Sequence, residues 1–179
     1  YPARPAKQPL VLTVCHLKRD NVKRKGLETF IAAARILPRY RFVIAGRDVD
    51  GTGAALRRGA PANLELSGHL EEPQLIEQMG RARVYAQLSA HEGFGCALAE
   101  AMLCGCVPVV TDRGSLPEVA GPDALTAAYG DAEGTAARIV EAMGVPDGSG
   151  YRSWIENEFS LERRRTAVGS VIDELAGRG

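Results

Sequence analysis

The sequence lacks any apolar run long enough to cross a membrane, since no stretch approaches the roughly 18 residues that a spanning helix needs. The first ten residues hold three prolines and two basic residues where a signal peptide would need an apolar core. We therefore expect a cytoplasmic protein without a transmembrane segment. Residues 1–9 are interpreted as a linker rather than as the start of a folded unit.

Cysteine is too sparse to indicate a disulfide framework. Four cysteines occur in 179 residues, whereas small disulfide-stabilised secreted domains are much richer in cysteine. Cys104 and Cys106 lie beside an apolar run, and no pair of histidines at metal-ligand spacing accompanies them. We expect buried, reduced thiols, no metal site and no cofactor.

The net charge is zero, but the two signs are unevenly distributed along the chain. Residues 1–60 hold 13 Lys and Arg against 4 Asp and Glu, and residues 61–179 hold 9 against 18. A basic half beside an acidic half suggests an anionic ligand on one side. Solvated faces that happen to segregate explain the pattern equally well. Nucleic acid is not expected as a partner.

Apolar segments with strand character alternate with helical periodicity along almost the whole chain. The predicted strands are 10–17, 41–45, 63–66, 84–88, 107–111 and 124–128. The predicted helices are 27–37, 54–58, 71–79, 96–103, 131–143, 151–158 and 161–175. Continuously apolar strands, each followed by a helix, indicate a parallel sheet covered on both faces. We predict a single doubly wound α/β domain over residues 10–179, with 151–179 as C-terminal helices and ligands bound at the carboxyl ends of the strands.

The most informative segment runs from His91 to Met102 and reads HEGFGCALAEAM. It follows a predicted strand and opens a predicted helix, so its turn presents free backbone N–H groups at a helix N-terminus. Those groups suit an anion or the hydroxyl groups of a polar ligand. Gly93 and Gly95 allow that ligand to approach the backbone closely.

Glu100 is the unusual residue of this segment, because every other residue from 96 to 106 is Ala, Leu, Met, Cys or Gly. Such a helix is expected to be buried, and a buried carboxylate is costly unless it is paired or hydrogen-bonded. One interpretation is a buried ion pair with an arginine such as Arg113 or Arg47. The other is that Glu100 accepts hydrogen bonds from ligand hydroxyl groups at the strand ends.

The motif around these residues resembles a known family. Glu92 and Glu100 lie eight positions apart and frame Gly-Phe-Gly; Val-Pro-Val-Val follows at 107–110 and Gly-Ser-Leu-Pro-Glu-Val at 114–119. Within the last motif, a serine followed three residues later by a glutamate predicts a helix capping box. The pattern is similar to the donor-binding domain of retaining glycosyltransferases of family 4, which have two Rossmann-like domains. The resemblance implies the C-terminal, nucleotide-sugar-binding half of a hexosyltransferase-like enzyme whose N-terminal, acceptor-binding half is missing.

The resemblance also implies roles for individual residues. The glutamate matching Glu92 contacts hydroxyl groups of the donor sugar, and the one matching Glu100 holds the ribose hydroxyls. The lysine matching Lys25 pairs with the diphosphate, so Lys25 and Glu92 are the expected catalytic residues. Backbone amides that contact sugar and diphosphate are implied at Gly93, Phe94, Gly95, Cys96, Ala97 and Leu98. An ammonium group and a helix N-terminus together would neutralise the departing nucleoside diphosphate, with no obligatory metal.

The sequence departs from the family pattern in its first loop. Cys15-His16 stands where the family has Gly-Arg, so the usual phosphate-binding arginine is absent. Residues 18–25 form a longer, basic loop that either supplies a substitute cation or is a solvated surface run. The further candidates for contacts to phosphate or base are His16, Arg19, Arg24, Arg47 and His69. A lone histidine such as His69 is more often structural.

The preferred hypothesis is transfer of a sugar from a nucleotide-diphosphate sugar to an acceptor. A non-catalytic module that binds a nucleotide sugar or phosphate remains the alternative. A Rossmann-type oxidoreductase is less consistent, because no Gly-x-Gly-x-x-Gly follows the first strand. The resemblance implies that residues 161–175 cross back to the missing domain and that the isolated chain does not complete transfer. Peripheral membrane contact of the full enzyme is compatible with this hypothesis.

Overall fold

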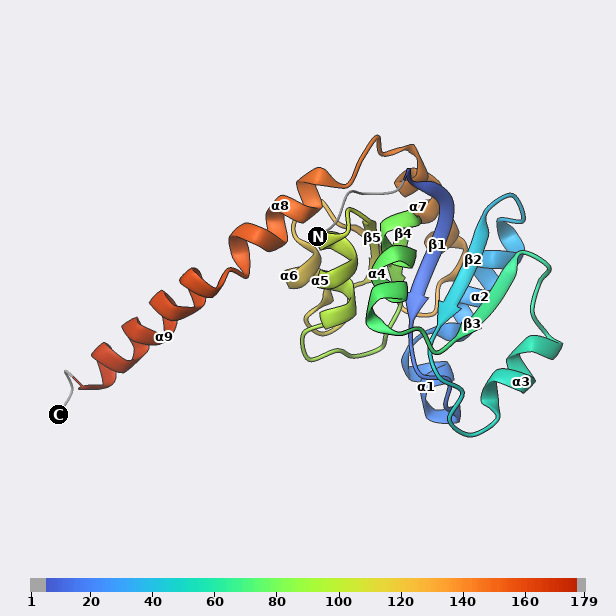
Figure 1. The fold of residues 1–179 in the computed structure, drawn as a ribbon, viewed down its shortest axis with the longest axis horizontal. Helices are drawn as coiled ribbons and strands as arrows, with labels where there is room; N and C mark the ends of the chain where they lie inside the picture. The colour runs from blue at the N-terminus through green and yellow to red at the C-terminus, as the bar shows by residue number, and fades with distance from the viewer. Residues whose placement is uncertain (1–5, 177–179) are drawn as a thin grey trace.

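A six-stranded sheet with helices on both faces forms the body of the protein, as the computed structural model of residues 6–176 shows (Figure 1). The strands are β1 (Gln8–Val14), β2 (Arg41–Ala45), β3 (Leu64–Gly68), β4 (Ala82–Gln87), β5 (Val107–Thr111) and β6 (Leu125–Ala127). All strand pairs are parallel, and the order in the sheet is β3-β2-β1-β4-β5-β6. This is the doubly wound, Rossmann-like order, so the predicted fold class is confirmed.

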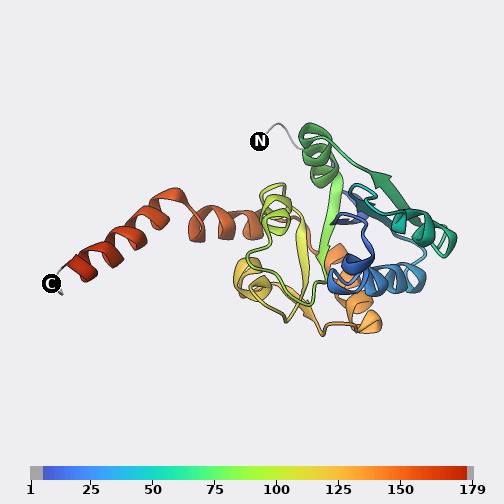
Figure 2. The same cartoon turned by 90° about the horizontal axis from the view of Figure 1, so that it is seen from below.

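Residues 6–176 form several helices, some of which cover the two faces of the sheet. They are α1 (Arg19–Arg24), α2 (Leu27–Ile36), α3 (Thr52–Arg58), α4 (Glu72–Arg81), α5 (Cys96–Leu103), α6 (Leu116–Ala120), α7 (Ala132–Gly144), α8 (Ser149–Glu158) and α9 (Leu161–Ala176). Helices α2 and α7 pack side by side on one face (Figure 2). Helices α4, α5 and α6 contribute to the core on the other face.

The central strands are buried on both sides, which is why they read as continuous apolar runs. Val11 of β1 and Ile44 of β2 pack in the layer that contains α2 and α7. Leu12 and Val43, one position away, pack in the layer that contains α4, α5 and α6. Successive side chains of a strand point to opposite faces. A strand that is apolar at every position therefore fits between two layers of helices.

The predicted strands and helices all occur, and the largest differences lie near the N-terminus. β2, α5 and β5 have their predicted bounds, whereas β1 begins at Gln8, inside the segment interpreted as a linker. Lys7 Nζ donates hydrogen bonds to the carbonyl oxygens of Met79 at 3.1 Å and Ala82 at 2.7 Å. Residues 7–9 are thus part of the folded domain. Residues 1–5 lie outside the described residues.

The basic segment 18–25, interpreted above as a loop, contains a helix that the sequence analysis missed. Helix α1 has Asp20 in its first turn and Lys23 and Arg24 in its last turn. This order of charges complements the helix dipole. Because α1 is only 6 residues long, its periodicity is too short to stand out in the sequence.

Helix α9 extends away from the sheet (Figures 1 and 2). It is 16 residues long, and none of them is buried. Its exposed large apolar side chains are Leu161, Val168, Val171, Ile172 and Leu175. Their spacing places them on one side of the helix, called here the α9 stripe. Within residues 6–176 no helix, α9 included, has the length and apolar character that crossing a bilayer requires.

Candidate functional site

The site lies where β1 and β4 end next to each other at the centre of the sheet. The chain leaves β1 toward the layer of α2, and it leaves β4 toward the layer of α5. Adjacent strands whose connections diverge in this way leave a crevice outside their carboxyl ends. Lys25 lies in the connection after β1, and Glu92 lies in the connection after β4.

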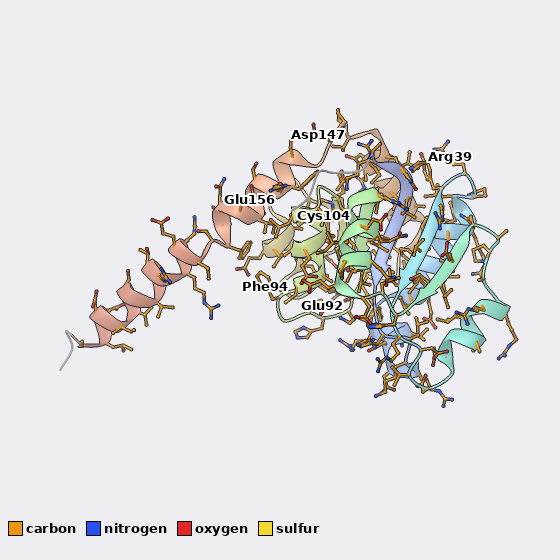
Figure 3. All side chains as sticks on the ribbon, viewed as in Figure 1. Arg39, Glu92, Phe94, Cys104, Asp147 and Glu156 are labelled. Carbon is orange, nitrogen blue, oxygen red and sulfur yellow. The ribbon has the colours of Figure 1, made fainter. Side chains whose placement is uncertain are left out.

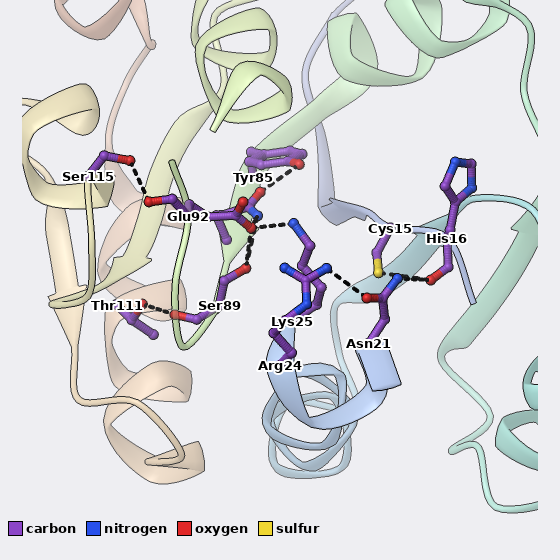
Figure 4. Close-up of polar contacts among 11 residues, drawn as sticks. Cys15, His16, Asn21, Arg24, Lys25, Tyr85, Ser89, Glu92, Thr111 and Ser115 are labelled. Atoms are coloured by element: carbon purple, nitrogen blue, oxygen red, sulfur yellow. Dashed lines mark hydrogen bonds and ion pairs between the residues drawn. The ribbon is translucent and has the colours of Figure 1, made fainter. Parts of the chain in front are cut away.

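Lys25 and Glu92, the two predicted catalytic residues, form an ion pair in this crevice (Figure 4). Lys25 Nζ donates a hydrogen bond to Glu92 Oε1. The two side chains are only 19% and 12% exposed. Sequence analysis assigned Lys25 to the diphosphate and Glu92 to the sugar without expecting them to touch. The structure places a cation and an anion together, and partial burial strengthens their attraction.

Gly26 explains how Lys25 reaches the end of β4. Its φ is 67°, in the left-handed region, and a Cβ at this position would overlap the carbonyl oxygen of Leu88. Close by, the Ala90 N–H donates to the Arg24 carbonyl at 2.8 Å. Only glycine combines this backbone conformation with so close an approach. The Lys-Gly pair of the motif therefore has a steric reason.

The carboxylate of Glu92 is held by buried donors as well as by Lys25. Glu92 Oε1 accepts hydrogen bonds from Gln87 Nε2 at 2.8 Å and Ser89 Oγ at 2.7 Å. Partial burial raises the pKa of Glu92, but the hydrogen bonds from Lys25 and Ser89, the charge of Lys25 and the hydrogen bond from Gln87 outweigh it. The pKa of Glu92 therefore lies below its ordinary value. Neither Gln87 nor Ser89 was predicted as a site residue from the sequence. The signal that could have indicated Gln87 is a polar residue within an apolar strand.

The backbone of Glu92 is held by the loop after β5. Ser115 donates to the Glu92 carbonyl oxygen from Oγ at 3.2 Å and from N–H at 3.4 Å. Gly114, with φ 59°, allows this approach, because a Cβ there would lie 2.8 Å from the same oxygen. The predicted capping box of Ser115 and Glu118 is wrong. The Ser115 hydroxyl makes no cap hydrogen bond to α6, because it donates to Glu92 instead.

A cleft of about 450 Å³ lies beside Lys25 at the carboxyl ends of β1 and β2. Its lining includes His16, Arg24, Lys25 and His69, so the fold brings these four predicted contacts together. Arg24 Nη2 also donates to Asn21 Oδ1 at 2.7 Å. The cleft therefore combines a lysine, an arginine and two histidines, which suits an anionic ligand.

Two other predicted phosphate contacts, Arg19 and Arg47, do not line this cleft. Arg19 opens α1, and its backbone N–H donates to Asp50 Oδ2 at 3.0 Å. Arg47 is exposed, and its carbonyl oxygen accepts from the Leu17 N–H at 2.8 Å. Neither arginine is among the described residues that line the cleft. Arg24 is thus better placed than either to replace the missing phosphate-binding arginine.

The Gly-Phe-Gly turn presents backbone N–H groups at the start of α5, as predicted. Gly95 is the N-cap residue. Within the described residues, the amides of Phe94, Gly95, Cys96 and Ala97 donate no hydrogen bond to a backbone acceptor outside the helix. The Leu98 amide, also predicted to contact the donor, already donates to the Gly95 carbonyl at 2.9 Å. Amides without a backbone acceptor, together with the helix dipole, make the start of α5 suited to an anion.

Glu100 is exposed, so the expectation of a buried carboxylate is wrong. The buried residues of α5 are Leu98, Ala99, Ala101 and Met102. Glu100 forms no ion pair within residues 6–176. Arg113, one of its two suggested partners, pairs instead with Asp112, with 3.4 Å between Arg113 Nε and Asp112 Oδ1. Although Glu100 is exposed, the surrounding protein removes some water from its carboxylate, and this desolvation, together with the charge of Glu72 at the start of α4, raises the pKa of Glu100. A carboxylate without a cation can accept hydrogen bonds from hydroxyl groups.

Phe94 links the turn to the C-terminal helices, a contact that sequence analysis missed. Its ring meets that of Phe159 edge-on, with centroids 5.1 Å apart and an angle of 79° between the planes. Phe159 lies between α8 and α9. In Figure 3, Phe94 and Glu92 project from the same loop, on the side of the body from which α9 extends. The Gly-Phe-Gly turn is therefore packed against Phe159, which precedes α9.

The cysteines and the possible metal ligands contribute no further site. Cys15, Cys104 and Cys106 are buried as expected, whereas Cys96 is exposed. Burial raises the pKa of Cys15 to about 11 and that of Cys106 to about 12. In the described part of the chain, no group of three or more His, Cys, Asp or Glu side chains is arranged to hold a metal ion.

Comparisons with known proteins agree with this architecture. The family described as "Glycosyl transferases group 1" matches residues 2–158. A GDP-mannose:cellobiosyl-diphosphopolyprenol alpha-mannosyltransferase from Xanthomonas campestris is 40% identical over an alignment of 91 residues that covers 48% of this chain and 24% of that protein. The lipopolysaccharide core biosynthesis mannosyltransferase LpcC from Rhizobium leguminosarum bv. viciae is 27% identical over an alignment of 172 residues that covers 86% of this chain and 49% of that protein.

A solved structure shows the same fold. Sucrose-phosphate synthase from Thermosynechococcus elongatus superimposes with a TM-score of 0.78 at 23% identity, over 98% of this chain and 47% of that one. The chain thus spans no more than about half the length of the relatives described here.

Proposed function

The chain belongs to the glycosyl transferases group 1 family, and on that premise we propose that it binds a nucleoside-diphosphate sugar in the crevice between β1 and β4. The observation that carries the proposal is the meeting of Lys25 and Glu92 beside a cleft lined by basic side chains. The chain is the donor half of a retaining enzyme that transfers the sugar to an acceptor. The acceptor half lies outside these 179 residues.

The diphosphate of the donor binds to Lys25, to Arg24 and to the free amides at the start of α5. Charge-assisted hydrogen bonds from an ammonium or guanidinium group to phosphate are roughly twice as strong as neutral ones. Donors that are fixed before the reaction stabilise the charge that develops on a leaving group without reorganisation. In this arrangement the leaving nucleoside diphosphate is neutralised by the protein alone, without an obligatory metal.

The sugar and the nucleoside bind to the two glutamates and to the far end of the cleft. Glu92 accepts hydrogen bonds from sugar hydroxyl groups, and Glu100 accepts them from the ribose. The proposal for Glu100 is supported by its exposure and by its nearness to Glu72, which lies three residues after His69 of the cleft. With the ribose at Glu100, His69 borders the base. His69 Nε2 lies 3.3 Å from Glu71 Oε1.

GDP-mannose is the donor that we propose. Two relatives support it: the Xanthomonas protein is named for GDP-mannose, and the Rhizobium protein is a mannosyltransferase. The proposed setting is the cytoplasm, where a nucleotide sugar is available to the enzyme.

Isothermal titration in the presence of EDTA tests the donor and its metal independence together. We expect heat of binding with GDP and GDP-mannose and weaker or no binding of UDP and UDP-glucose. Lys25→Met should weaken GDP binding by about 1.5 to 3 kcal/mol, or roughly one to two decades in affinity. Lys18→Met is the matched control, because Lys18 pairs with Asp20 at 3.2 Å on the surface and does not line the cleft.

Each outcome bears on a different part of the proposal. Binding of the uridine nucleotides alone would support the proposed donor site but contradict GDP-mannose as the donor. Absence of heat with all four nucleotides, from a sample with a cooperative unfolding transition, would overturn the site itself.

A further inference from the structure

A network of buried, hydrogen-bonded side chains connects the core of the domain to Glu92. Tyr85 donates from its hydroxyl group to Gln87 Oε1 at 3.0 Å, and Gln87 Nε2 donates to Ser89 Oγ at 3.1 Å. Tyr85 and Ser89 are 0% exposed, and Gln87 is 5% exposed. The network ends at Glu92 Oε1, which accepts hydrogen bonds from both Gln87 and Ser89. Figure 4 shows the contact between Ser89 and Glu92.

The carboxylate of Glu92 fixes the direction of the hydrogen bonds in this network. An ionised carboxylate only accepts, so Gln87 must turn its amide nitrogen toward Glu92 and its oxygen toward Tyr85. Both hydrogens of the Gln87 amide are then used, one for Ser89 and one for Glu92. Buried networks of this kind specify one arrangement when they are fully satisfied. Among the described residues, no buried side-chain nitrogen or oxygen lacks a partner.

The two oxygens of the Glu92 carboxylate differ as a consequence. Oε1 accepts three hydrogen bonds, from Lys25, Gln87 and Ser89. Oε2 accepts none from the residues that the structure describes. The protein therefore anchors one oxygen and leaves the other to accept a hydrogen bond from a ligand.

We propose that Gln87, supported by Tyr85, is a positioning residue that anchors Glu92 Oε1 so that Oε2 faces a hydroxyl group of the donor sugar. The inference rests on the proposed function of the crevice and adds a residue that determines how tightly the sugar is held. Gln87 itself touches no ligand and acts through Glu92. Lys25 alone cannot anchor Glu92 Oε1, because in the proposed function Lys25 also binds the diphosphate.

The ratio of the GDP dissociation constant to the GDP-mannose dissociation constant measures the contribution of the sugar. Gln87→Met keeps the length of the side chain and removes its donors, and we expect this ratio to fall about tenfold while GDP affinity is kept. Gln87→Met leaves the Tyr85 hydroxyl without its acceptor. Adding Tyr85→Phe removes that hydroxyl, so the double variant should regain part of the lost stability but not the lost ratio. Thr135→Val is the control for lost stability: Thr135 is also 0% exposed, and its hydroxyl donates to the Asp131 carbonyl at 2.6 Å, on α7.

A double-mutant cycle separates positioning from a general structural effect. If Gln87 acts through Glu92, Gln87→Met should lower the ratio in the wild-type background and leave it unchanged in the Glu92→Gln background. An equal loss in both backgrounds, or an unchanged ratio in Gln87→Met, overturns the inference. A ratio that falls equally in Thr135→Val also overturns it, because lost stability would then be the cause.

A carboxyl-carbon NMR titration of Glu92 tests the inference without any nucleotide. A hydrogen bond to the ionised form lowers the pKa, so its removal in Gln87→Met should raise the pKa of Glu92. If wild-type protein binds GDP-mannose no more tightly than GDP, the proposed role of Glu92 toward the sugar fails while the titration still reports on the anchor. An unchanged titration of Glu92 in Gln87→Met overturns the anchor itself.

Discussion

Glu92 and Glu100 belong to one sequence motif but lie in different electrostatic environments. Glu92 is paired with Lys25 and surrounded by donors, and its pKa is lowered. Glu100 is exposed on α5 beside the charge of Glu72, and its pKa is raised. The first carboxylate is stabilised by hydrogen bonds from the protein, whereas the second is open to water and, in our proposal, to the ribose.

This difference predicts different effects of the two amide substitutions on binding. Glu100→Gln should weaken GDP and GDP-mannose alike, because the ribose is common to both. Glu92→Gln should weaken GDP-mannose and leave GDP no weaker than before. Each lost hydrogen bond to a carboxylate should cost roughly 1.5 to 3 kcal/mol, or about one to two decades in the dissociation constant. Titration calorimetry measures all four values, and an equal loss of GDP affinity in both variants contradicts these roles.

The same difference predicts how stability depends on pH. Because the native state lowers the pKa of Glu92, its contribution is fully present above the ordinary value of 4.5 and is lost as pH falls through the lower native value. The free energy of unfolding of Glu92→Gln should therefore lie below that of wild type at neutral pH, by on the order of 1 kcal/mol, and the gap should close at acid pH. Urea unfolding over this pH range measures the gap.

Glu100→Gln is the control for this measurement. The raised pKa of Glu100 means that the native state disfavours its ionised form, so this substitution should not lower stability at neutral pH. A gap between wild type and Glu92→Gln that stays constant with pH would show that the carboxylate charge is not the cause.

The two loops that follow β1 and β4 form the site as a pair. Gly26 lets the loop after β1 pack against the end of β4, and Ser115 holds the Glu92 backbone from the loop after β5. Phe94 adds a contact to Phe159 at the base of α9. Each of these contacts joins elements that are far apart in the sequence, so the position of every ligand-facing group depends on a neighbouring element.

Gly26→Ala tests how far the site depends on this packing. The substitution strains a left-handed backbone and places a Cβ against the Leu88 carbonyl oxygen, so it should lower the free energy of unfolding by roughly 2 to 4 kcal/mol. Displacement of Lys25 should also weaken GDP binding. Gly51→Ala is a matched control: Gly51 has φ 81° but nothing within 4 Å of an added Cβ, so it should lose only about 1 kcal/mol and no affinity. Equal losses of stability for the two variants would show that the packing against β4 is unimportant.

Helix α9 has an apolar side that no other residue in the described range 6–176 covers. The α9 stripe is exposed along the helix, and Leu161 and Leu175 are 73% and 66% exposed. The chain spans about half or less of its relatives' length. The family resemblance implied that residues 161–175 cross back to an acceptor-binding domain, and such a crossing would account for both observations.

The isolated chain should accordingly bind donor without transferring mannose to an acceptor. A single α/β unit offers one wall of the proposed interdomain cleft, so an acceptor cannot be held in a fixed position beside the donor. Slow hydrolysis of GDP-mannose by water is the reaction that remains open. Incubation with labelled GDP-mannose and lipid-linked or soluble glycan acceptors, followed by chromatography, measures both products. Robust transfer by the 179-residue chain would contradict the proposal.

The sequence by itself determined the succession of strands and helices and hence the fold class. Apolar runs such as Val107–Thr111 and the helical spacing after Gly95 are local patterns, and local periodicity suffices to predict them. The same patterns also indicated that Lys25 and the Gly-Phe-Gly turn follow strand ends, since the carboxyl edge of a parallel sheet collects such loops. The family resemblance added their roles toward a nucleotide sugar.

Only the tertiary structure decided how those residues meet. Glu100 was expected to be buried because its neighbours in sequence are apolar, but burial depends on which side of α5 faces the sheet. Ser115 has the spacing of a cap but donates to Glu92, because a loop from another strand lies within reach. The pairing of Lys25 with Glu92 and its support by Gln87 join residues whose proximity arises from the parallel pairing of β1 with β4. Contacts of this kind depend on the packing of distant segments, which no local pattern of residues encodes.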